Sequence, residues 1–546
     1  MQNGYKFLDG WCLYMLRFLK KKLGFRQLKK SMEMKQEDNK TREMTSDFTA
    51  SLEENLRAVR QILKQSSDIV LRRFTLGRDE TAAAALIFID GLVQKELVHE
   101  NILEPLMSRA DFPKENPDGC AGFLKSSLLY VGEIKDTASV YDAVNGILSG
   151  DTLLLLDGSK KAIIISVRGW EARSVEEPKT ETVVRGPREG FAETLRVNTS
   201  LLRRKIKSPD FVLETLTLGE RTRTDVCIAY IESLADPKLI EEVRLRLGRI
   251  QTDAILESGY IEEFIEDAPY SIFSTVGNSE KPDKVAAKLL EGRAAILVDG
   301  TPFVLTVPAL FVESFHASED YYSRPLFASA IRLLRYMAFF ISVFAPALYV
   351  ALVNFHQELI PTPLLLTMAA AHEGIPFPSV IEAGLMVTVF EILREAGVRL
   401  PRSVGQAVSM VGALVIGDAA VSAGLIGAPM VIVVAITAVS SFVVTPQVDS
   451  GAILRYSFLI LAAFMGGYGI AMGIFAVIIH LASLRSFGTP YFSPFAPFNS
   501  QDMKDSLIRS HMWKMRKRPK DIPTQDQTRL ESSQGPVPPA PEQSYE

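Results

Sequence analysis

Two carboxylates lie four residues apart in a stretch that is otherwise mainly apolar. They are Glu391 and Glu395, and a helix over 380–396 would place both on one stripe with Gly384 and Thr388. Such a helix can face water along that stripe. If copies of the chain surrounded one axis, the carboxylates would form rings of the kind that attract monovalent cations. Glu391, Glu395 and Thr388 are therefore candidates for an ion path.

The same two carboxylates could instead be neutralised locally. Arg394 follows Glu391 at i+3, and Arg399 follows Glu395 at i+4. Side chains at these spacings are neighbours on a helix surface and form ion pairs. The sequence leaves the ion path and the local pairs open as alternatives.

A further carboxylate, Asp418, is the only ionisable side chain between residues 403 and 448. A charged group in so apolar a stretch must face a partner, a cavity or a subunit contact. Structural hydrogen bonding is the alternative. Asp418 joins the candidates for the ion path.

Nothing in the chain is typical of an enzyme, a metal site or a cofactor site. His99 and His316 are isolated, no nucleophile-elbow or phosphate-loop motif occurs, and Cys12, Cys120 and Cys227 have no CxxC spacing. A formal charge of -4 and a pI near 6.0 give no attraction to nucleic acid. We expect no catalytic residues, no metal, no cofactor and no nucleic-acid partner.

The elements that would position the acidic residues are membrane spans. A bilayer span needs roughly 20 apolar residues, and helices satisfy their own backbone groups in hydrocarbon. The sequence predicts four to six spans, at 336–353, twice within 403–445 with a break near 424–429, at 456–484, and as a further candidate at 378–396.

Within the last apolar stretch, Gly469 and Gly473 form a small-xxx-small pattern. Small residues at this spacing let two helix backbones approach closely. We predict that these glycines serve helix packing.

Orientation is partly readable from basic residues. Arg394, Arg399 and Arg402 cluster in one loop, and more basic residues follow residue 485, so both regions should be cytoplasmic, with the N-terminal domain. Five crossings would put the C-terminus outside. Either one segment is re-entrant, or Leu359–Ala371 also crosses.

The soluble region contains an internal repeat at a constant offset of 142 residues. Thr75–Gly77 matches Thr217–Gly219, and Asp157-Gly158 matches Asp299-Gly300. Each Asp-Gly lies between two apolar runs, which suggests a hairpin with a type I′ turn. We predict a duplicated α/β soluble N-terminal domain, followed by an α-helical transmembrane domain.

The expected division of the chain follows from these patterns. It comprises a basic, amphipathic extension at 1–47, α/β subdomain 1 at 48–180, a charged linker at 181–209, α/β subdomain 2 at 210–325, the transmembrane domain at 326–486, a C-terminal cytoplasmic segment at 487–518 and a disordered Pro-rich tail at 519–546. The extension could be a membrane-surface helix or lie upstream of a true start at Met32, Met34 or Met44.

The linker is dense in charge. We treat its charged side chains as candidates for a subunit interface, with a solvated linker as the alternative; they are Arg185, Arg188, Glu189, Arg203 and Arg204.

Several segments together resemble one family. They are Gly186–Phe191 with Asn198 and Arg203-Arg204, Phe311–Phe315 with Glu319–Tyr322, Phe390–Gly397, Gly405–Val408 and Ser493–Phe498. With them the chain resembles the A subunit of the GerA-type nutrient germinant receptors of bacterial endospores. It departs from the family pattern at His372, where Arg is expected, and at Asp418, where Gln is more usual.

The resemblance implies a multi-pass protein of the spore inner membrane with a cytoplasmic N-terminal domain. Its partners would be membrane lipid, a transporter-like B subunit that senses the germinant and a lipoprotein C subunit. It implies a homo-oligomeric ion channel, a pentamer by the family's order, that releases monovalent cations. The alternatives are a non-conducting scaffold that relays the signal and the related accessory protein of dipicolinate release.

Overall fold

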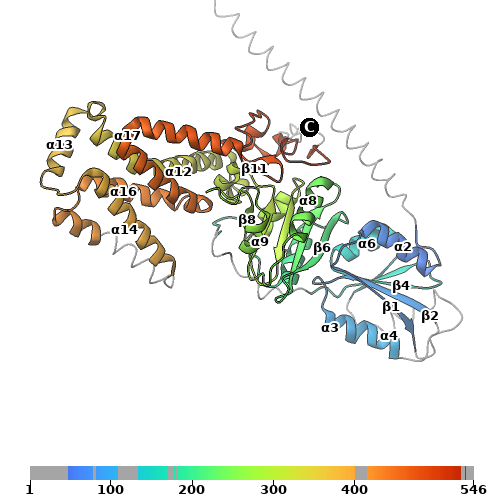
Figure 1. Cartoon of the computed structure of the whole chain (residues 1–546). Coiled ribbons are helices and arrows are strands. Elements are labelled where there is room, and N and C mark those ends of the chain that lie inside the picture. The colour runs from blue at the N-terminus through green and yellow to red at the C-terminus, as the bar shows by residue number, and fades with distance from the viewer. Residues whose placement is uncertain are drawn as a thin grey trace, which may run out of the picture.

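The computed structural model describes residues 47–77, 82–108, 133–169, 178, 181, 183–399, 415–530 and 535–536. The extension predicted at 1–47 lies outside these residues except for its last one. Two α/β subdomains, together called the head, are followed by a helical bundle that continues from the second subdomain (Figure 1).

Subdomain 1 is a five-stranded antiparallel sheet in the order β1-β2-β4-β5-β3 with helices on both faces. Leu154 and Leu156 pack on one face and Leu153 and Leu155 on the other, because successive side chains alternate across a strand. Its elements are α2 (Leu52–Leu63), β1 (Ile69–Leu76), β2 (Ala82–Ile89), α3 (Lys95–Val98), the π-helical η1 (His99–Leu103), α4 (Glu104–Ser108), β3 (Ile134–Thr137), α6 (Val140–Leu148), β4 (Thr152–Leu156) and β5 (Ala162–Ile165).

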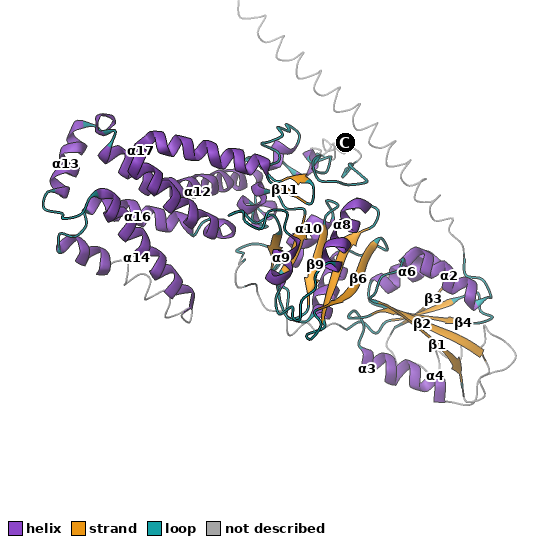
Figure 2. Ribbon diagram, viewed as in Figure 1, coloured by secondary structure: helices purple, strands orange, loops and turns teal. Residues whose placement is uncertain are grey.

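Subdomain 2 repeats this topology, with strand order β6-β7-β9-β10-β8 (Figure 2). The register repeats as well: Leu76 pairs with Ala82, and 142 residues later Leu218 pairs with Thr224. The duplicated α/β fold is confirmed. Its elements are α7 (Leu195–Lys205), β6 (Phe211–Leu218), β7 (Thr224–Ile231), α8 (Pro237–Gly248), α9 (Ser258–Ile265), β8 (Gly277–Ser279), α10 (Pro282–Leu289), β9 (Ala294–Val298) and β10 (Val304–Val307).

The Asp-Gly pairs do not form type I′ turns, so that prediction is wrong. A type I′ turn needs positive φ at both central residues, and here only Gly158 (φ 85°) and Gly300 (φ 90°) have it. The aspartates instead cap helices: Asp157 Oδ1 accepts from the backbone N–H of Leu52, 3.0 Å away, at the start of α2. Asp299 does the same in the second repeat.

The predicted charged linker contains the first helix of the second repeat. Asn198 accepts from Ala192 N and donates to Ala192 O, as Asn55 does with Thr49 in front of α2. Leu202 of α7 is fully buried against the sheet of subdomain 2. The prediction of a linker at 181–209 is therefore wrong for residues 195–205, which form α7. The charged side chains of α7 lie on its outer face and in its last turn.

The bundle begins at the end of subdomain 2. It comprises η3 (Phe311–Phe315), α11 (Glu319–Tyr322), α12 (Pro325–Asn354), η4 (Gln357–Leu359), α13 (Thr362–His372), α14 (Ser379–Arg399), α16 (Ala428–Ser441), η5 (Thr445–Gln447) and α17 (Val448–Ser483). Pro325–Asn354 and Thr445–Ser483 are long and apolar enough to cross a membrane.

α17 is two antiparallel helices. At Gly466 the backbone leaves the helical region (φ 57°, ψ -139°), and a Cβ on Gly473 would lie 2.5 Å from Cε1 of Phe458. In a straight helix these residues would be about 22 Å apart. The prediction of one span at 456–484 is therefore wrong, because the chain turns back at Gly466.

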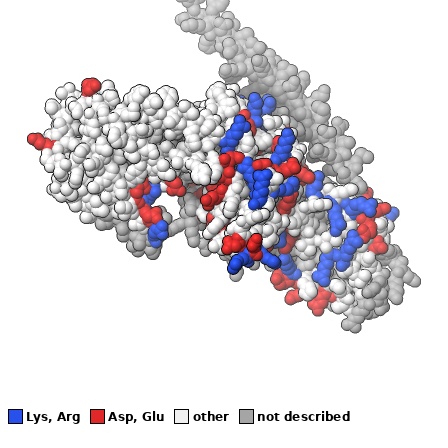
Figure 3. Space-filling view, viewed as in Figure 1, with Lys and Arg blue, Asp and Glu red and all other residues white. Residues whose placement is uncertain are grey.

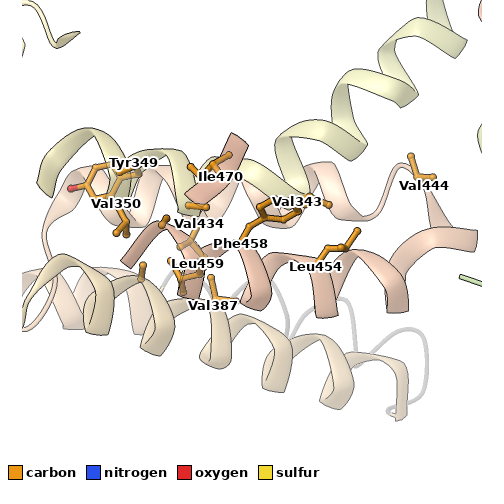
Figure 4. Packing of buried hydrophobic residues seen from close by; sticks show 14 of the residues in the cluster. Val343, Tyr349, Val350, Val387, Val434, Val444, Leu454, Phe458, Leu459 and Ile470 are labelled. Atoms are coloured by element: carbon orange, nitrogen blue, oxygen red, sulfur yellow. The ribbon is translucent and has the colours of Figure 1, made fainter. Parts of the chain in front are cut away.

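The two halves of α17 pack with α12, α14 and α16 around one core (Figure 4). Val343 and Val350 of α12, Val387 of α14, Val434 of α16 and Phe458 of α17 are all buried there. The core runs the length of the bundle, so the helices lie side by side.

The direction of each helix follows from contacts at the two ends of the bundle. At the head end, Gln447 Nε2 donates to Ser314 Oγ (2.8 Å). There, too, Nε2 of His480 lies 2.9 Å from Oγ of Ser271 in the head. At the far end, Ser379 Oγ donates to Asn354 (2.9 Å). α13 starts and ends at the far end and does not run back to the head, so Leu359–Ala371 is not the missing crossing.

The C-terminal segment (487–530) folds back on the head. Thr524 pairs with Ala235, Gln525 Nε2 donates to Glu232 O (2.8 Å), and Ile522 is fully buried. The prediction of a disordered tail from 519 is wrong for residues 519–530. The elements that follow α17 are β11 (Arg485–Ser486), β12 (Thr489–Pro490), η6 (Asp502–Asp505) and η7 (Met512–Lys514).

Candidate functional site

Glu391 lies in α14 and is held inside the bundle. One of its oxygens forms an ion pair with Arg455 of α17, and the other lies 2.8 Å from Nη2 of Arg394. Arg455 is 1% exposed and donates from Nε to the backbone oxygen of Ser342 in α12, 2.7 Å away. Glu391 thus links α14 to α17 and, through Arg455, to α12. The pair with Arg394 is the local pair that the sequence offered as an alternative. The two guanidinium groups already balance the charge of Glu391.

Glu395 and Thr388 lie on the same stripe of α14 and are exposed. Glu395 pairs with Arg399 (2.6 Å) in the manner of a surface i,i+4 pair. Thr388 Oγ1 donates to Gly384 O (2.7 Å) and lies 3.2 Å from the hydroxyl of Tyr456. These polar groups are accessible from outside a single bundle.

Asp418 is exposed on the short helix at 415–422, and its neighbour Gly417 packs against Val431 of α16. Within the part of the chain that the structure describes, Asp418 has neither an ion-pair nor a hydrogen-bond partner. It is a carboxylate on an otherwise apolar surface, so of the four candidates it is the most available to water or to another chain.

A buried acidic residue near the far end was not anticipated from sequence. Glu382 of α14 is 1% exposed, accepts from the backbone N–H of Gly427 and lies 3.2 Å from Nε2 of His372. The ring of Tyr349 stacks on His372 with 6.4 Å between centroids. The sequence did contain a signal for this residue, since Glu382 is the lone acid of an apolar run. Its contact with His372 ties α13 to α14.

Gly469 and Gly473 line the interface between the two halves of α17. A Cβ on Gly469 would lie 2.4 Å from the backbone oxygen of Leu461, closer than real Cβ contacts allow. Glycine at 469 lets the backbones of the two halves touch, and glycine at 473 leaves room for the side chains of Phe458 and Leu461. The small-xxx-small pattern thus lies at a contact between two helices of the same chain.

A buried charge network joins the start of the bundle to the C-terminal segment. Arg332 of α12 is fully buried and lies 3.2 Å from Asp320 and 3.0 Å from Asp505 of the C-terminal segment. Arg335 also pairs with Asp320, at 2.8 Å. The start of α12 is therefore fixed to both flanking segments.

A second charge cluster lies beside it. Burial alone would raise the pKa of Glu313, but the guanidinium of Arg293 and the ammonium of Lys288 lower that pKa to about 2. Burial and the guanidinium of Arg332 lower the pKa of His316 to about 4. His316 is neutral near pH 7, and its Nε2 lies 3.3 Å from Ser506 O.

The candidate interface residues separate into two groups. Arg185 and Arg188 are exposed, whereas Glu189 pairs with Arg204 at 3.1 Å. Arg203 is 1% exposed and forms a contact inside the chain, so it is not available to a neighbouring subunit. Its prediction as an interface residue is wrong, because burial cannot be read from residue type.

Comparison with known proteins gives one consistent family. The model of the Bacillus/Clostridium GerA spore germination protein matches residues 57–521. The chain is similar to spore germination protein KA of Bacillus subtilis, at 47% identity over 90% of each chain. It is also similar to the uncharacterised membrane protein YfkQ of the same organism, at 44% identity over 88% of this chain and 93% of that protein.

Among solved structures, the chain matches the N-terminal domain of the A subunit of the Bacillus megaterium spore germinant receptor GerK3. The identity is 35% and the TM-score 0.37, over 49% of this chain and 98% of that one.

Proposed function

The chain belongs to the Bacillus/Clostridium GerA spore germination protein family, and on that premise we propose that it is the cation-conducting membrane subunit of a spore nutrient germinant receptor. In this proposal the bundle lies in the spore inner membrane and the head in the cytoplasm. Copies of the chain, five by the family's order, surround one path. A germinant-sensing B subunit and a lipoprotein C subunit are its partners.

The apolar surface of the bundle supports its place in a membrane. Phe464, Phe475 and Ile479 of α17 are more than half exposed, and Figure 3 shows few charged side chains on the bundle compared with the head. An exposed apolar surface of this extent is suited to lipid. Each half of α17 is about 25 Å long, close to the thickness of a bilayer core.

The direction of the helices supports six crossings. Among the described residues, α12, α14 and α16 each run between the head end and the far end, and α17 does so twice. α14 ends at Arg399 and α16 begins after Gly427 at the far end, so we count the chain between them as the sixth crossing. An even number returns the chain to the side of the head. This agrees with cytoplasmic placement of the basic residues after residue 485 without a re-entrant segment.

The observation that carries the ion path is the exposed Asp418, which has no ion-pair or hydrogen-bond partner among the residues that the structure describes. A carboxylate facing lipid is costly, so Asp418 should face water or another copy of the chain. With Thr388 and Glu395 exposed on α14, a ring of subunits would line its axis with oxygen atoms and negative charge. Glu391 supports this lining from within the bundle.

Single-channel recording tests the proposal. The purified chain, alone and with its co-expressed partners, is placed in planar bilayers and compared with Asp418→Asn and Glu395→Lys. Cation currents whose conductance falls or whose selectivity changes in these variants would support the proposal. Glu53→Gln, an exposed change in subdomain 1, should leave the currents unchanged.

A silent bilayer, despite a verified oligomer and partner complex, would contradict conduction. The family's other reading, a scaffold that relays the signal without conducting, would then be favoured.

A further inference from the structure

The C-terminal segment carries a group of exposed cations. Lys504, Lys514, Arg516 and Lys517 line one hollow of about 260 Å³. Within the described part of the chain none of the four has a carboxylate partner. They are therefore free to bind an external anion.

The acids beside this hollow are already engaged. Glu291 pairs with Arg529 at 3.0 Å, and Asp505 pairs with the buried Arg332. Asp502 accepts from the backbone N–H of Lys520, and burial raises the pKa of its carboxyl. The hollow thus keeps an excess of positive charge.

Large apolar side chains are exposed on the same segment. Phe498 is 73% exposed, Ile508 64% and Met512 49%, and the ammonium of Lys514 lies 5.0 Å from the ring centre of Trp513. Cations interleaved with exposed apolar and Trp side chains are typical of segments that lie in a membrane interface.

The position of the segment agrees with this composition. Arg509 N donates to Ser329 Oγ (3.0 Å), which holds the segment beside the first turns of α12. There Leu326 is 86% exposed and Phe327 62%. Figure 3 shows basic side chains where the C-terminal segment meets the nearly uncharged bundle. The cations therefore lie at the height where the headgroups would begin.

We propose that residues 498–517 form a membrane-interface anchor that binds the headgroups of anionic glycerophospholipids through Lys504, Lys514, Arg516 and Lys517. The inference rests on the proposed membrane location of the bundle. Lipid composition on the head side would then act on Arg332 through Asp505, which belongs to the anchor and pairs with Arg332.

Fluorescence of Trp513 tests the anchor. Trp11→Phe and Trp170→Phe leave it as the single Trp of the full chain. The protein is placed in nanodiscs with a headgroup spin-labelled phosphatidylcholine, with or without phosphatidylglycerol. We expect phosphatidylglycerol to increase quenching roughly twofold, and added salt to reverse the increase. The double variant Lys504→Glu with Lys514→Glu should abolish the increase in quenching caused by phosphatidylglycerol. The control variant Lys160→Glu with Lys161→Glu, on subdomain 1, should keep that increase.

A Trp placed in the bundle tests the membrane location of the bundle separately from the anchor. With Leu334→Trp in α12 and Trp513→Phe, quenching must occur whether or not phosphatidylglycerol is present. If Leu334→Trp is quenched while Trp513 shows no response to phosphatidylglycerol, the anchor is overturned and the membrane location stands. If Leu334→Trp is not quenched, both are overturned.

Discussion

Nη2 of Arg203 lies 2.9 Å from Oδ1 of Asp68, although the two residues are 135 positions apart and belong to different repeats. Both side chains are 2% exposed, and Ser66 and the backbone oxygen of Phe211 complete the bonds of the guanidinium. Beside this pair, Ser67 N donates to Leu213 O at 2.9 Å. The contact fixes subdomain 1 against the edge of the sheet of subdomain 2.

Asp68→Asn should destabilise the head strongly. The change leaves a buried guanidinium without its counter-charge, which costs about 3–5 kcal/mol. Denaturant unfolding of the full chain in detergent measures the loss. Glu53→Gln breaks an exposed pair with Arg73 and should cost less than about 1 kcal/mol. Equal losses in the two variants would contradict a structural role for the buried pair.

Glu391→Gln and Glu395→Gln should differ in stability. The first leaves Arg455 buried without a carboxylate, whereas the second affects an exposed pair. Thermal unfolding in detergent should show a clear fall of Tm only for Glu391→Gln. Arg455→Met combined with Glu391→Gln should recover part of it, because both charges are then gone. A double variant less stable than the sum of the singles would argue against the pair.

Cysteine labelling should place Gly466 and Arg485 on opposite sides of the membrane. In a background without Cys12, Cys120 and Cys227, a membrane-impermeant thiol reagent added from outside should label Tyr468→Cys. Arg485→Cys should react only after the membrane is opened. Labelling of both from one side would show that the chain does not cross between them.

Acid should destabilise the junction between head and bundle through His316. Its pKa is 6.5 when unperturbed and about 4 here, so the unfolded state binds more protons between these values. The stabilisation is complete above pH 6.5 and is lost as the pH falls toward 4, by about 3 kcal/mol. The charged groups that face this imidazole are those of Arg332, Asp505 and Glu313.

The check is thermal unfolding in detergent between pH 7.5 and 4.5. His316→Gln should flatten the fall in Tm, while His99→Gln, an exposed change, should leave it as in the unchanged chain. Parallel profiles for all three proteins would exclude His316 as the source.

The repeat could be predicted from sequence because Asp157-Gly158 and Asp299-Gly300 keep their types at a fixed spacing. The role of the two aspartates could not be predicted, since each caps a helix that begins about 105 residues earlier in the chain. The charges of α7 suggested a linker because most of its buried residues are polar, so that its sequence shows little apolar periodicity. Patterns in the local sequence indicate contacts between residues that are near in the chain, but not contacts between distant residues.

The candidate site shows the same limit. The stripe on α14 follows from helical spacing, so the exposure of Thr388 and Glu395 could be anticipated. The partner of Glu391 could not, because Arg455 lies 64 residues away. The turn at Gly466 was missed since glycine in an apolar run is also typical of straight, closely packed helices.

The pairing of Thr524 with Ala235 ties the turn between β7 and α8 to a segment that is translated after the whole bundle. Subdomain 2 therefore cannot receive this pairing until both halves of α17 and residues 485–523 have been synthesised. A chain truncated before residue 524 would leave this surface of subdomain 2 uncovered.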